Sequence, residues 1–173
     1  MARSRIGFTN LRIDAINLWL NRLCLLTSGD KNHHNTMTIG WGSIGAMWSK
    51  PFIQVVVRPQ RYTYEFMEKY STFTVSVLPV QYKDAMQIMG SKSGRDTDKV
   101  KETGLTVVNS EIVEAPSFKE AELVFECRKN YWQDMNPDNF LDNSIFDKYT
   151  AKDYHRIYYG EILAINGESY YKA

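Results

Sequence analysis

The chain of 173 residues has few of the features that mark several protein classes. It has two cysteines, Cys24 and Cys127, three histidines and a formal net charge of +1. Two separated cysteines cannot staple a disulfide scaffold, and the histidines lack the spacing that metal ligands require. A charge this close to zero gives no global field that would draw the chain onto nucleic acid or a membrane. Any bound anion must therefore be held by a local group of cations.

Long apolar runs are also missing. The longest one near the N-terminus covers residues 16–20 and is interrupted by Asn17, which is too short and too polar for a signal peptide or a membrane span. We interpret residues 1–20 as an amphipathic segment that leads into the first strand. The unpaired cysteines and the lack of an N-x-S/T acceptor favour a cytoplasmic protein. We expect one domain over residues 1–173, long enough to bury its own core.

Aromatic residues make up 13% of the chain, which suits a β-rich protein. Tyr62, Phe66 and Tyr70 recur on one face of a helix expected over residues 61–70, and two further helices should end at Gly90 and Gly104.

A polar, turn-rich insertion at residues 134–152 precedes the last strand. Strands are expected at residues 23–27, 36–41, 52–57, 73–78, 121–130 and 155–165. Because helices and strands do not alternate regularly, we predict a mainly β (α+β) fold, an antiparallel barrel with short helices outside.

The segment from Gly40 to Gly45 matches the dinucleotide fingerprint GxGxxG. That fingerprint requires a helix directly after the glycines, so that the pyrophosphate meets the helix N-terminus. Here Pro51 and a strong strand pattern follow within six residues, which leaves no room for the helix. We interpret the glycines as a Gly-rich loop between neighbouring strands, with the geometry of a bulged hairpin. Such a loop would also let a flat ring approach backbone amides.

Two polar segments have the chemistry of an anion site. Residues 58–63 join a strand to a helix and combine Arg58 and Arg61 with Thr63 and the free N–H groups of a helix start; the alternative is a pair of solvated surface arginines. Residues 91–95 form a loop rich in hydroxyls and cations, which either accepts an anion or caps the following helix through Ser93 or Asp96. His155, just before the last strand, reads on sequence alone as an exposed loop residue.

These segments occur together in a fixed order. They are Asn35-Thr36-Met37-Thr38 with Trp41-Gly42, Trp48 to Pro51, Val57 to Thr63, Phe73-Thr74-Val75, Gly90 to Lys99, Gly104-Leu105-Thr106 and His155 to Ile162. In this order they resemble the flavin reductase-like proteins, a family that includes flavoredoxin. The resemblance covers about residues 25–165, and the ordered combination is more specific than any single motif.

The resemblance implies an FMN-binding split barrel that forms a homodimer, with the flavin near the subunit interface. It implies that the ring lies against Asn35, Thr36, Met37, Thr38, Trp41 and Gly42. The phosphate would be held by Arg58, Arg61, Tyr62 and Thr63, with Ser93, Gly94 and Lys99 closing over it. His155 matches the position of a histidine that lies beside the flavin and the nicotinamide in related flavin reductases.

Two functions remain open at this point. One is an FMN-dependent oxidoreductase that accepts hydride from NADH or NADPH and passes electrons to a free flavin or a partner protein. The other is a flavoredoxin-like electron carrier with little reactivity toward nicotinamides. Both fit the lack of a visible acid–base pair, because the cofactors perform the chemistry and the protein orients the rings. A module that binds pyridoxal phosphate or haem is a third option, although its usual lysine or axial-ligand context is missing.

Overall fold

Strands dominate the computed structural model, which describes residues 2–173. They are β1 (Ser4–Arg5), β2 (Cys24–Gly29), β3 (His34–Ile39), β4 (Gly42–Met47), β5 (Lys50–Val57), β6 (Thr72–Val77), β7 (Val107–Val108), β8 (Ser117–Phe118), β9 (Leu123–Asp134) and β10 (Arg156–Gly167). The α-helices are α1 (Ala15–Asn17), α2 (Tyr62–Lys69), α3 (Lys83–Ser91) and α4 (Lys99–Thr103). Short 3-10 or π segments are η1 (Phe8–Asn10), η2 (Leu18–Arg22), η3 (Val80–Tyr82), η4 (Pro137–Asn139), η5 (Asn143–Lys148) and η6 (Ser169–Tyr171).

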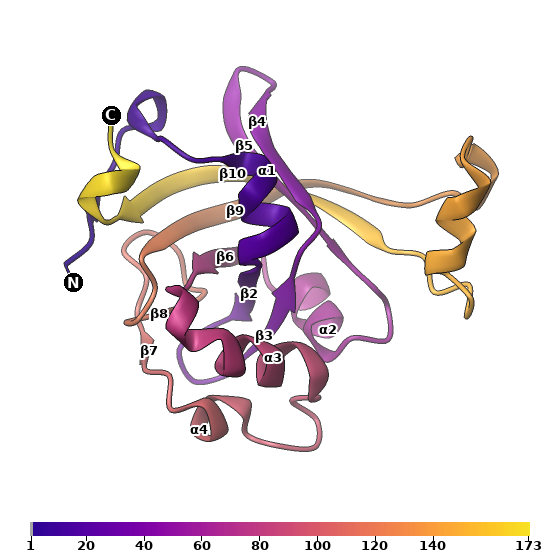
Figure 1. Cartoon of the computed structure of the whole chain (residues 1–173), viewed down its shortest axis with the longest axis horizontal. Helices are drawn as coiled ribbons and strands as arrows, with labels where there is room; N and C mark the ends of the chain where they lie inside the picture. Colours follow the sequence, from indigo (N-terminus) through magenta and orange to yellow (C-terminus); the bar gives the residue numbers. More distant parts are fainter. Residues whose placement is uncertain (1) are drawn as a thin grey trace.

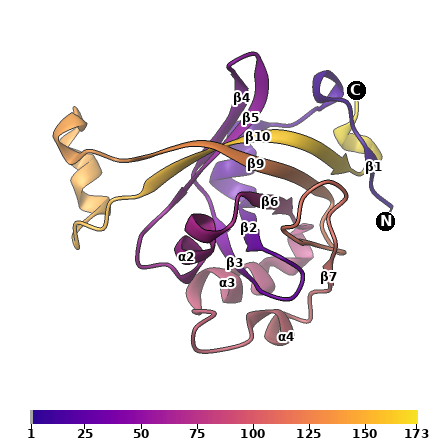
Figure 2. The same ribbon diagram turned by 180° about the vertical axis from the view of Figure 1, so that it is seen from behind.

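One large antiparallel sheet runs in the order β3-β2-β6-β9-β10-β5-β4, and β1 adds to β10. Every strand pairing in residues 2–173 is antiparallel, including the small β7–β8 sheet. Helices α2, α3 and α4 lie together on one side of the long β9–β10 ribbon (Figures 1 and 2). The mainly β, antiparallel fold with short outer helices is thus confirmed. The six expected strands are present, and β9 and β10 are longer than their sequence patterns indicated.

The glycine-rich segment is the main departure from expectation. Residues 42–47 form strand β4, which pairs with β5 in an unbroken register, so the prediction of a loop with a bulged hairpin was wrong. The glycines serve close packing instead: a Cβ atom on Gly42 would lie 2.6 Å from the Gln54 carbonyl oxygen and 2.7 Å from the Trp19 ring. The chain reverses later, at Trp48 and Ser49, whose φ angles are 53° and 56°.

The helices differ from expectation at their ends. Helix α3 runs through Gly90 to Ser91, because the N–H of Lys92 still donates to the Ile88 carbonyl oxygen at 3.1 Å. Helix α4 starts later than expected, and its N-cap is Asp98 rather than Ser93 or Asp96. Gly104 ends α4 in the left-handed conformation, with φ of 67°, as its position predicted.

The N-terminal segment has the amphipathic character that its sequence indicated. Leu18 and Trp19 on η2 are buried, whereas Ile16 and Leu20 are about 70% exposed. None of the helices in residues 2–173 is long and apolar enough to cross a membrane.

Two apolar clusters form the core. The larger one fills the space enclosed by the sheet and includes Trp19, Phe73 and Tyr158. The smaller one joins the sheet to α3 through Leu25 and Met89. Because α3 and α2 both pack on β3, the two clusters hold the helices firmly against this edge strand.

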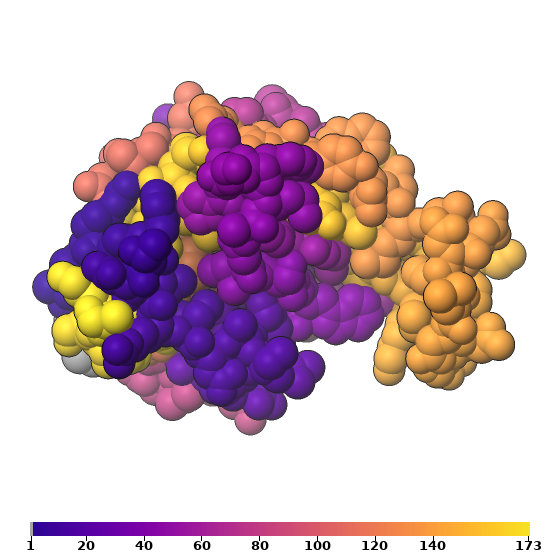
Figure 3. Space-filling view, turned by 90° about the horizontal axis from the view of Figure 1, so that it is seen from above, coloured from indigo at the N-terminus to yellow at the C-terminus, as the bar shows by residue number. Residues whose placement is uncertain are grey.

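The insertion at residues 134–152 projects from the body of the molecule, at the end of the β9–β10 ribbon (orange in Figure 3). It contains η4 and η5 and has the turn-rich character that its sequence predicted. Its own aromatic side chains pack together, with Phe140 against Phe146 and Tyr149, and Tyr154 just after the insertion also contacts Phe140. The insertion therefore has a small apolar centre of its own, outside the main core.

Candidate functional site

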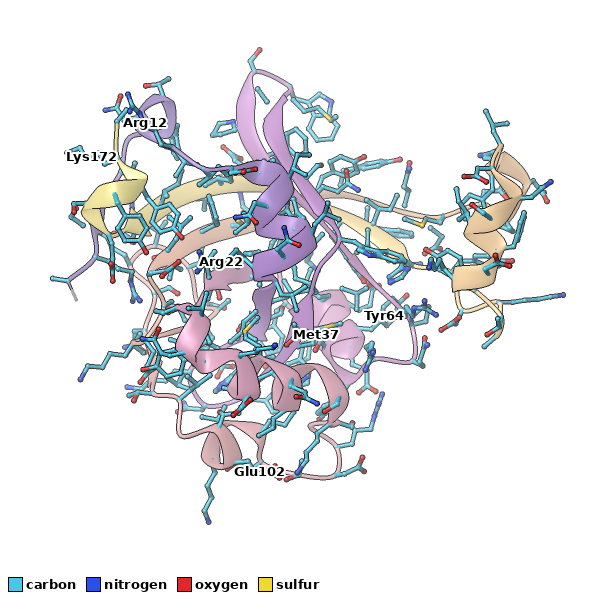
Figure 4. The ribbon with its side chains drawn as sticks, viewed as in Figure 1. Arg12, Arg22, Met37, Tyr64, Glu102 and Lys172 are labelled. Atoms are coloured by element: carbon cyan, nitrogen blue, oxygen red, sulfur yellow. The ribbon has the colours of Figure 1, made fainter. Side chains whose placement is uncertain are left out.

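A groove runs along β3, where this strand meets α2 and α3. Figure 4 marks Met37 on the strand, beside both helices. The groove has two adjoining parts, which share Met37 and Arg61. The first, called here the loop pocket, has a volume of about 330 Å³ and is lined by Asn35, Met37, Gln60, Arg61, Tyr62, Thr63, Met89, Ser91, Lys92, Ser93, Gly94, Arg95, Asp96 and Lys99. The second, called the indole pocket, has a volume of about 210 Å³ and is lined by Met37, Thr38, Ile39, Gly40, Trp41, Val56, Arg58, Arg61 and His155.

Lys99 is the most unusual residue of the loop pocket. It is 6% exposed, and its ammonium group donates hydrogen bonds to the carbonyl oxygens of Thr36 and Met89. Burial, and then the nearby positive charge of Arg61, lower the pKa of Lys99 to about 8. A buried ammonium with only neutral acceptors is costly, so this position is suited to an anion that enters from outside the chain.

Arg61 adds a second cation at the start of α2. Its guanidinium donates to the Gly90 carbonyl oxygen at 3.1 Å. In the part of the chain that the structure describes, neither Arg61 nor Lys99 forms an ion pair. Helix α2 also begins here without a side-chain cap, which leaves N–H groups of its first turn available to an acceptor. Together these groups have the charge and the hydrogen-bond donors that a phosphate or a similar anion requires.

The wall of the loop pocket is fixed by buried polar contacts. The side-chain amide of Asn35 donates to the Thr63 hydroxyl at 2.7 Å, and both residues are buried. The loop after α3 packs directly on this pair, because a Cβ atom on Gly94 would lie 2.1 Å from the Asn35 amide oxygen. Only glycine fits at this position, and the close approach brings Ser93 and Lys99 to the pocket.

The indole pocket has an aromatic wall. The ring centroids of Trp41 and His155 lie 5.1 Å apart, and Trp41 is 45% exposed while His155 is buried. Burial, and then the charge of Arg58, lower the pKa of His155 to about 4, so the imidazole is neutral near pH 7. The hydroxyl of Thr38 is turned away, since it donates to the Met86 carbonyl oxygen at 2.6 Å. This pocket therefore offers a flat aromatic surface beside one neutral imidazole, with the guanidinium groups of Arg58 and Arg61 on its lining.

Arg58 is placed differently from the other residues of the expected phosphate site. It lines the indole pocket and not the loop pocket. Its guanidinium forms an ion pair with Asp153 at 2.5 Å and donates to the Lys148 carbonyl oxygen at 2.7 Å. It also lies over the Tyr149 ring, 5.0 Å from the centroid. Arg58 thus holds the base of the insertion, and its assignment to the phosphate stays a prediction.

The remaining sequence-predicted residues fall into two groups. Of the thirteen cofactor-contact candidates, the loop pocket gathers Asn35, Met37, Arg61, Tyr62, Thr63, Ser93, Gly94 and Lys99, and the indole pocket adds Thr38, Trp41 and Arg58, with His155 beside them. Two candidates line neither pocket. Gly42 packs against Trp19, and the Thr36 hydroxyl bonds to Thr27 at 2.9 Å. Thr36 instead contributes its carbonyl oxygen to Lys99.

Three residues of the site escaped sequence reasoning. Met89 contributes its carbonyl oxygen to Lys99, Asp153 pairs with Arg58, and Tyr149 contacts His155. Backbone acceptors leave no signal in a sequence, and the other two belong to or follow an insertion without a recognisable motif. No group of three or more His, Cys, Asp or Glu side chains within residues 2–173 is arranged to hold a metal ion.

Comparisons with known proteins identify the family and the fold. An uncharacterized protein of Pyrococcus abyssi is 30% identical over 150 residues, which cover 85% of this chain and 74% of that protein. An FMN-binding domain of a flavin reductases-like enzyme from Shewanella baltica superposes with a TM-score of 0.70 at 16% identity, covering 96% of this chain and 78% of that one.

Two further solved structures have the same fold. Flavoredoxin from Methanosarcina acetivorans has a TM-score of 0.69 at 23% identity and covers 97% of this chain and 74% of its own. An NADH:FAD oxidoreductase from Streptomyces globisporus has a TM-score of 0.63 at 19% identity and covers 83% and 73%. These likenesses confirm the split-barrel fold. Because residues 21–171 also match the flavin reductase like domain, this chain belongs to the flavin reductase-like family.

Proposed function

We propose that the protein binds FMN along the β3 groove and is an FMN-dependent oxidoreductase. In this proposal it accepts hydride from NADH or NADPH and passes electrons to a free flavin or to a partner protein. The observation that carries the proposal is the buried Lys99 beside Arg61, two cations that no carboxylate within residues 2–173 neutralises, in a chain of the flavin reductase-like family.

The residues of the groove fit the two ends of FMN. A phosphate monoester carries nearly two negative charges at neutral pH and takes charge-assisted hydrogen bonds. The loop pocket offers the Lys99 ammonium, the Arg61 guanidinium, the Ser93 hydroxyl and the start of α2 for it. The indole pocket offers Trp41 and His155 for the ring. The similarity to an FMN-binding domain of known structure supports the same assignment.

The chain's own residues account for binding and electrostatics rather than for chemistry. Bound FMN would supply a hydride-accepting ring. Trp41 and the neutral His155 orient aromatic ligands at the open side of the indole pocket. Arg61 lies where the two pockets meet, so its positive charge can offset negative charge that develops on the ring. No acid–base pair is needed at the site.

The first experiment is an absorbance and fluorescence titration of the purified protein with FMN, followed by anaerobic addition of NADH or NADPH. We expect FMN fluorescence to change on binding and the visible flavin band to bleach with one of the nicotinamides. Protein that is colourless and leaves FMN fluorescence unchanged would rule out the flavin assignment.

The second candidate function is a flavoredoxin-like electron carrier. The fold of this chain is as similar to that of a flavoredoxin as to that of an FMN-binding domain of a flavin reductases-like enzyme. This similarity supports the electron carrier as the alternative. A carrier would hold FMN but react slowly with both nicotinamides, and a chemical reductant would still bleach the bound flavin. Stopped-flow measurement of the bleaching rate with NADH, NADPH and dithionite therefore separates the two functions.

We further propose that the protein is a cytoplasmic homodimer with the flavin near the subunit interface. The exposed side chains of Trp48 and Tyr131 form an aromatic cluster with the half-buried Tyr159 beside the edge strand β4. This cluster supports the dimer, since such patches mark contact surfaces. The buried, unpaired thiols Cys24 and Cys127 support a reducing compartment. Light scattering after size exclusion tests the dimer: a monomer at micromolar concentration would contradict it.

A further inference from the structure

The insertion at residues 134–152 returns to the body of the molecule through Tyr149. This side chain is 4% exposed. Phe140 stacks on its ring at 5.9 Å with an interplanar angle of 16°, and the guanidinium of Arg58 lies 5.0 Å from its centroid. Arg58 is fixed in turn by Asp153. The phenol is therefore held in one orientation by groups from the insertion and from the end of β5.

The Tyr149 hydroxyl meets the imidazole of His155. Its oxygen lies 2.8 Å from Nδ1 of His155 and 3.3 Å from the sulfur of Met135. A thioether sulfur is a weak acceptor and an unprotonated imidazole nitrogen is a strong one. The phenol has a single proton, and Nδ1 is both the nearer and the stronger of its two acceptors. Donation to Nδ1 would place the proton of the neutral imidazole on Nε2.

The second ring nitrogen of His155, Nε2, is left available to a ligand. Within residues 2–173, Nε2 of His155 takes part in no hydrogen bond, yet it is not among the buried polar atoms that lack a partner. It therefore retains contact with solvent, and the open space that His155 lines is the indole pocket. An Nε2–H group at this place can donate to a carbonyl or carboxamide oxygen of an aromatic ligand.

We propose that Tyr149 is a positioning residue, which fixes His155 as the Nε2–H tautomer with this N–H directed into the indole pocket. The insertion thereby supplies part of the site, although it projects from the barrel. The low pKa of His155, about 4, is consistent with this arrangement because the imidazole stays neutral. The tautomer itself does not depend on flavin binding, whereas an effect on hydride transfer rests on the proposed function.

The tautomer can be read from two-bond ¹H–¹⁵N spectra of protein labelled with ¹⁵N-histidine, without any cofactor. The chain has three histidines, and His155→Gln identifies the signal of interest. We expect Nε2 of His155 to be the protonated nitrogen in the wild-type protein from pH 6 to 8. Protonation at Nδ1 would overturn the proposal on this spectrum alone, whatever the variants do.

Three variants sharpen the measurement. Tyr149→Phe keeps the ring and its packing but removes the hydroxyl, and we expect the two His155 tautomers to become mixed. Tyr154→Phe is the matched control, because its ring packs 5.0 Å from that of Tyr149 and its hydroxyl does not contact His155. Met135→Leu removes the competing sulfur and should leave the tautomer unchanged. A single unchanged tautomer in Tyr149→Phe, or a new one in Met135→Leu, contradicts the proposal.

A kinetic measurement connects the tautomer to function. In FMN-loaded protein we expect Tyr149→Phe to slow bleaching by the nicotinamide about five- to tenfold, the ratio that corresponds to one hydrogen bond, with FMN affinity unchanged. Tyr154→Phe should leave the rate unchanged. If wild-type protein is not reduced by NADH or NADPH, the proposed function fails while the tautomer result still stands. A normal rate in Tyr149→Phe, with wild type active, contradicts the role of Tyr149 in the reaction.

Discussion

Arg58 and Arg61 are three residues apart in the sequence, but their surroundings differ in one decisive respect. Arg58 has a carboxylate partner in Asp153 and a carbonyl partner in Lys148. Arg61 has only the Gly90 carbonyl oxygen, and the buried Lys99 beside it likewise bonds only to carbonyl groups. A cation that the chain itself neutralises serves the scaffold, whereas one left without an anion is available to a ligand. This contrast between the two ends of the groove can be tested by substitution and by pH.

The largest effect is expected at Lys99. Lys99→Met keeps the aliphatic stem and removes the ammonium, which should weaken FMN binding roughly 10- to 100-fold, as expected for one charge-assisted hydrogen bond of about 1.5–3 kcal/mol. Fluorescence titration with FMN measures the change. Lys101→Met on the same helix, where the side chain is exposed, is the control and should bind normally. Equal affinities for both variants would show that the phosphate site lies elsewhere.

The next largest effect on FMN affinity is expected at Arg61, and Arg58 should behave differently. Arg61→Ala is expected to weaken FMN binding roughly tenfold, since it removes a cation near the phosphate. Arg58→Ala should leave FMN affinity within about twofold, because its bonds go to the insertion, but should speed proteolytic cleavage between residues 134 and 152. Parallel titration and limited proteolysis of both variants would test the contrast. A larger loss of affinity in Arg58→Ala than in Arg61→Ala would reverse it.

The pH dependence of FMN binding tests the role of the Lys99 ammonium in the unsubstituted protein. With a pKa of about 8, Lys99 is charged below that pH and becomes neutral above it. Affinity should therefore be complete near pH 7 and fall by up to about tenfold at pH 9, one unit above this pKa. The same titration in Lys99→Met should show a flat profile over this range. A wild-type profile that is equally flat would mean that the ammonium does not contact the bound anion.

The smallest effect is expected at Thr63. This hydroxyl accepts the Asn35 amide rather than facing the pocket freely, so Thr63→Val should act by leaving that amide without its acceptor. We expect a few-fold loss of FMN affinity and about 1 kcal/mol lower stability, measured by titration and by urea unfolding. A loss as large as that of Lys99→Met would indicate that Thr63 bonds to the phosphate directly.

Much of the fold followed from local sequence patterns. The strand of Val55, Val56 and Val57 is visible from its run of β-branched residues. The helix is visible because Tyr62 and Phe66 lie four residues apart. The departures have a common cause. The glycine pattern predicts a loop at Gly42, but this residue lies in a strand that Trp19 packs against. Such a contact between distant segments is not encoded in local period or turn propensity.

The residues of the candidate site also fall into those that local sequence predicts and those that depend on distant partners. Lys99 and Arg61 could be proposed from the sequence, because hydroxyls and cations at helix starts are a local feature. The role of Arg58 could not, since its partner Asp153 is 95 positions away and the ion pair exists only when the insertion folds back to the end of β5. Tyr149 was hidden for the same reason. Long-range pairing, and not residue type, decides which of two similar arginines is free.

The turn between β4 and β5 has a consequence for engineering. Two-residue hairpin turns with positive φ at both positions favour Asn-Gly. Other side chains are strained at positive φ by roughly 1–2 kcal/mol per residue. Here Trp48 and Ser49 occupy both positions, and the indole rests near Tyr131 and Tyr159. Exchanging the pair through Trp48→Asn and Ser49→Gly should raise the melting temperature. The size of that rise would give the cost of backbone strain at this turn less the contacts that the indole makes with Tyr131 and Tyr159.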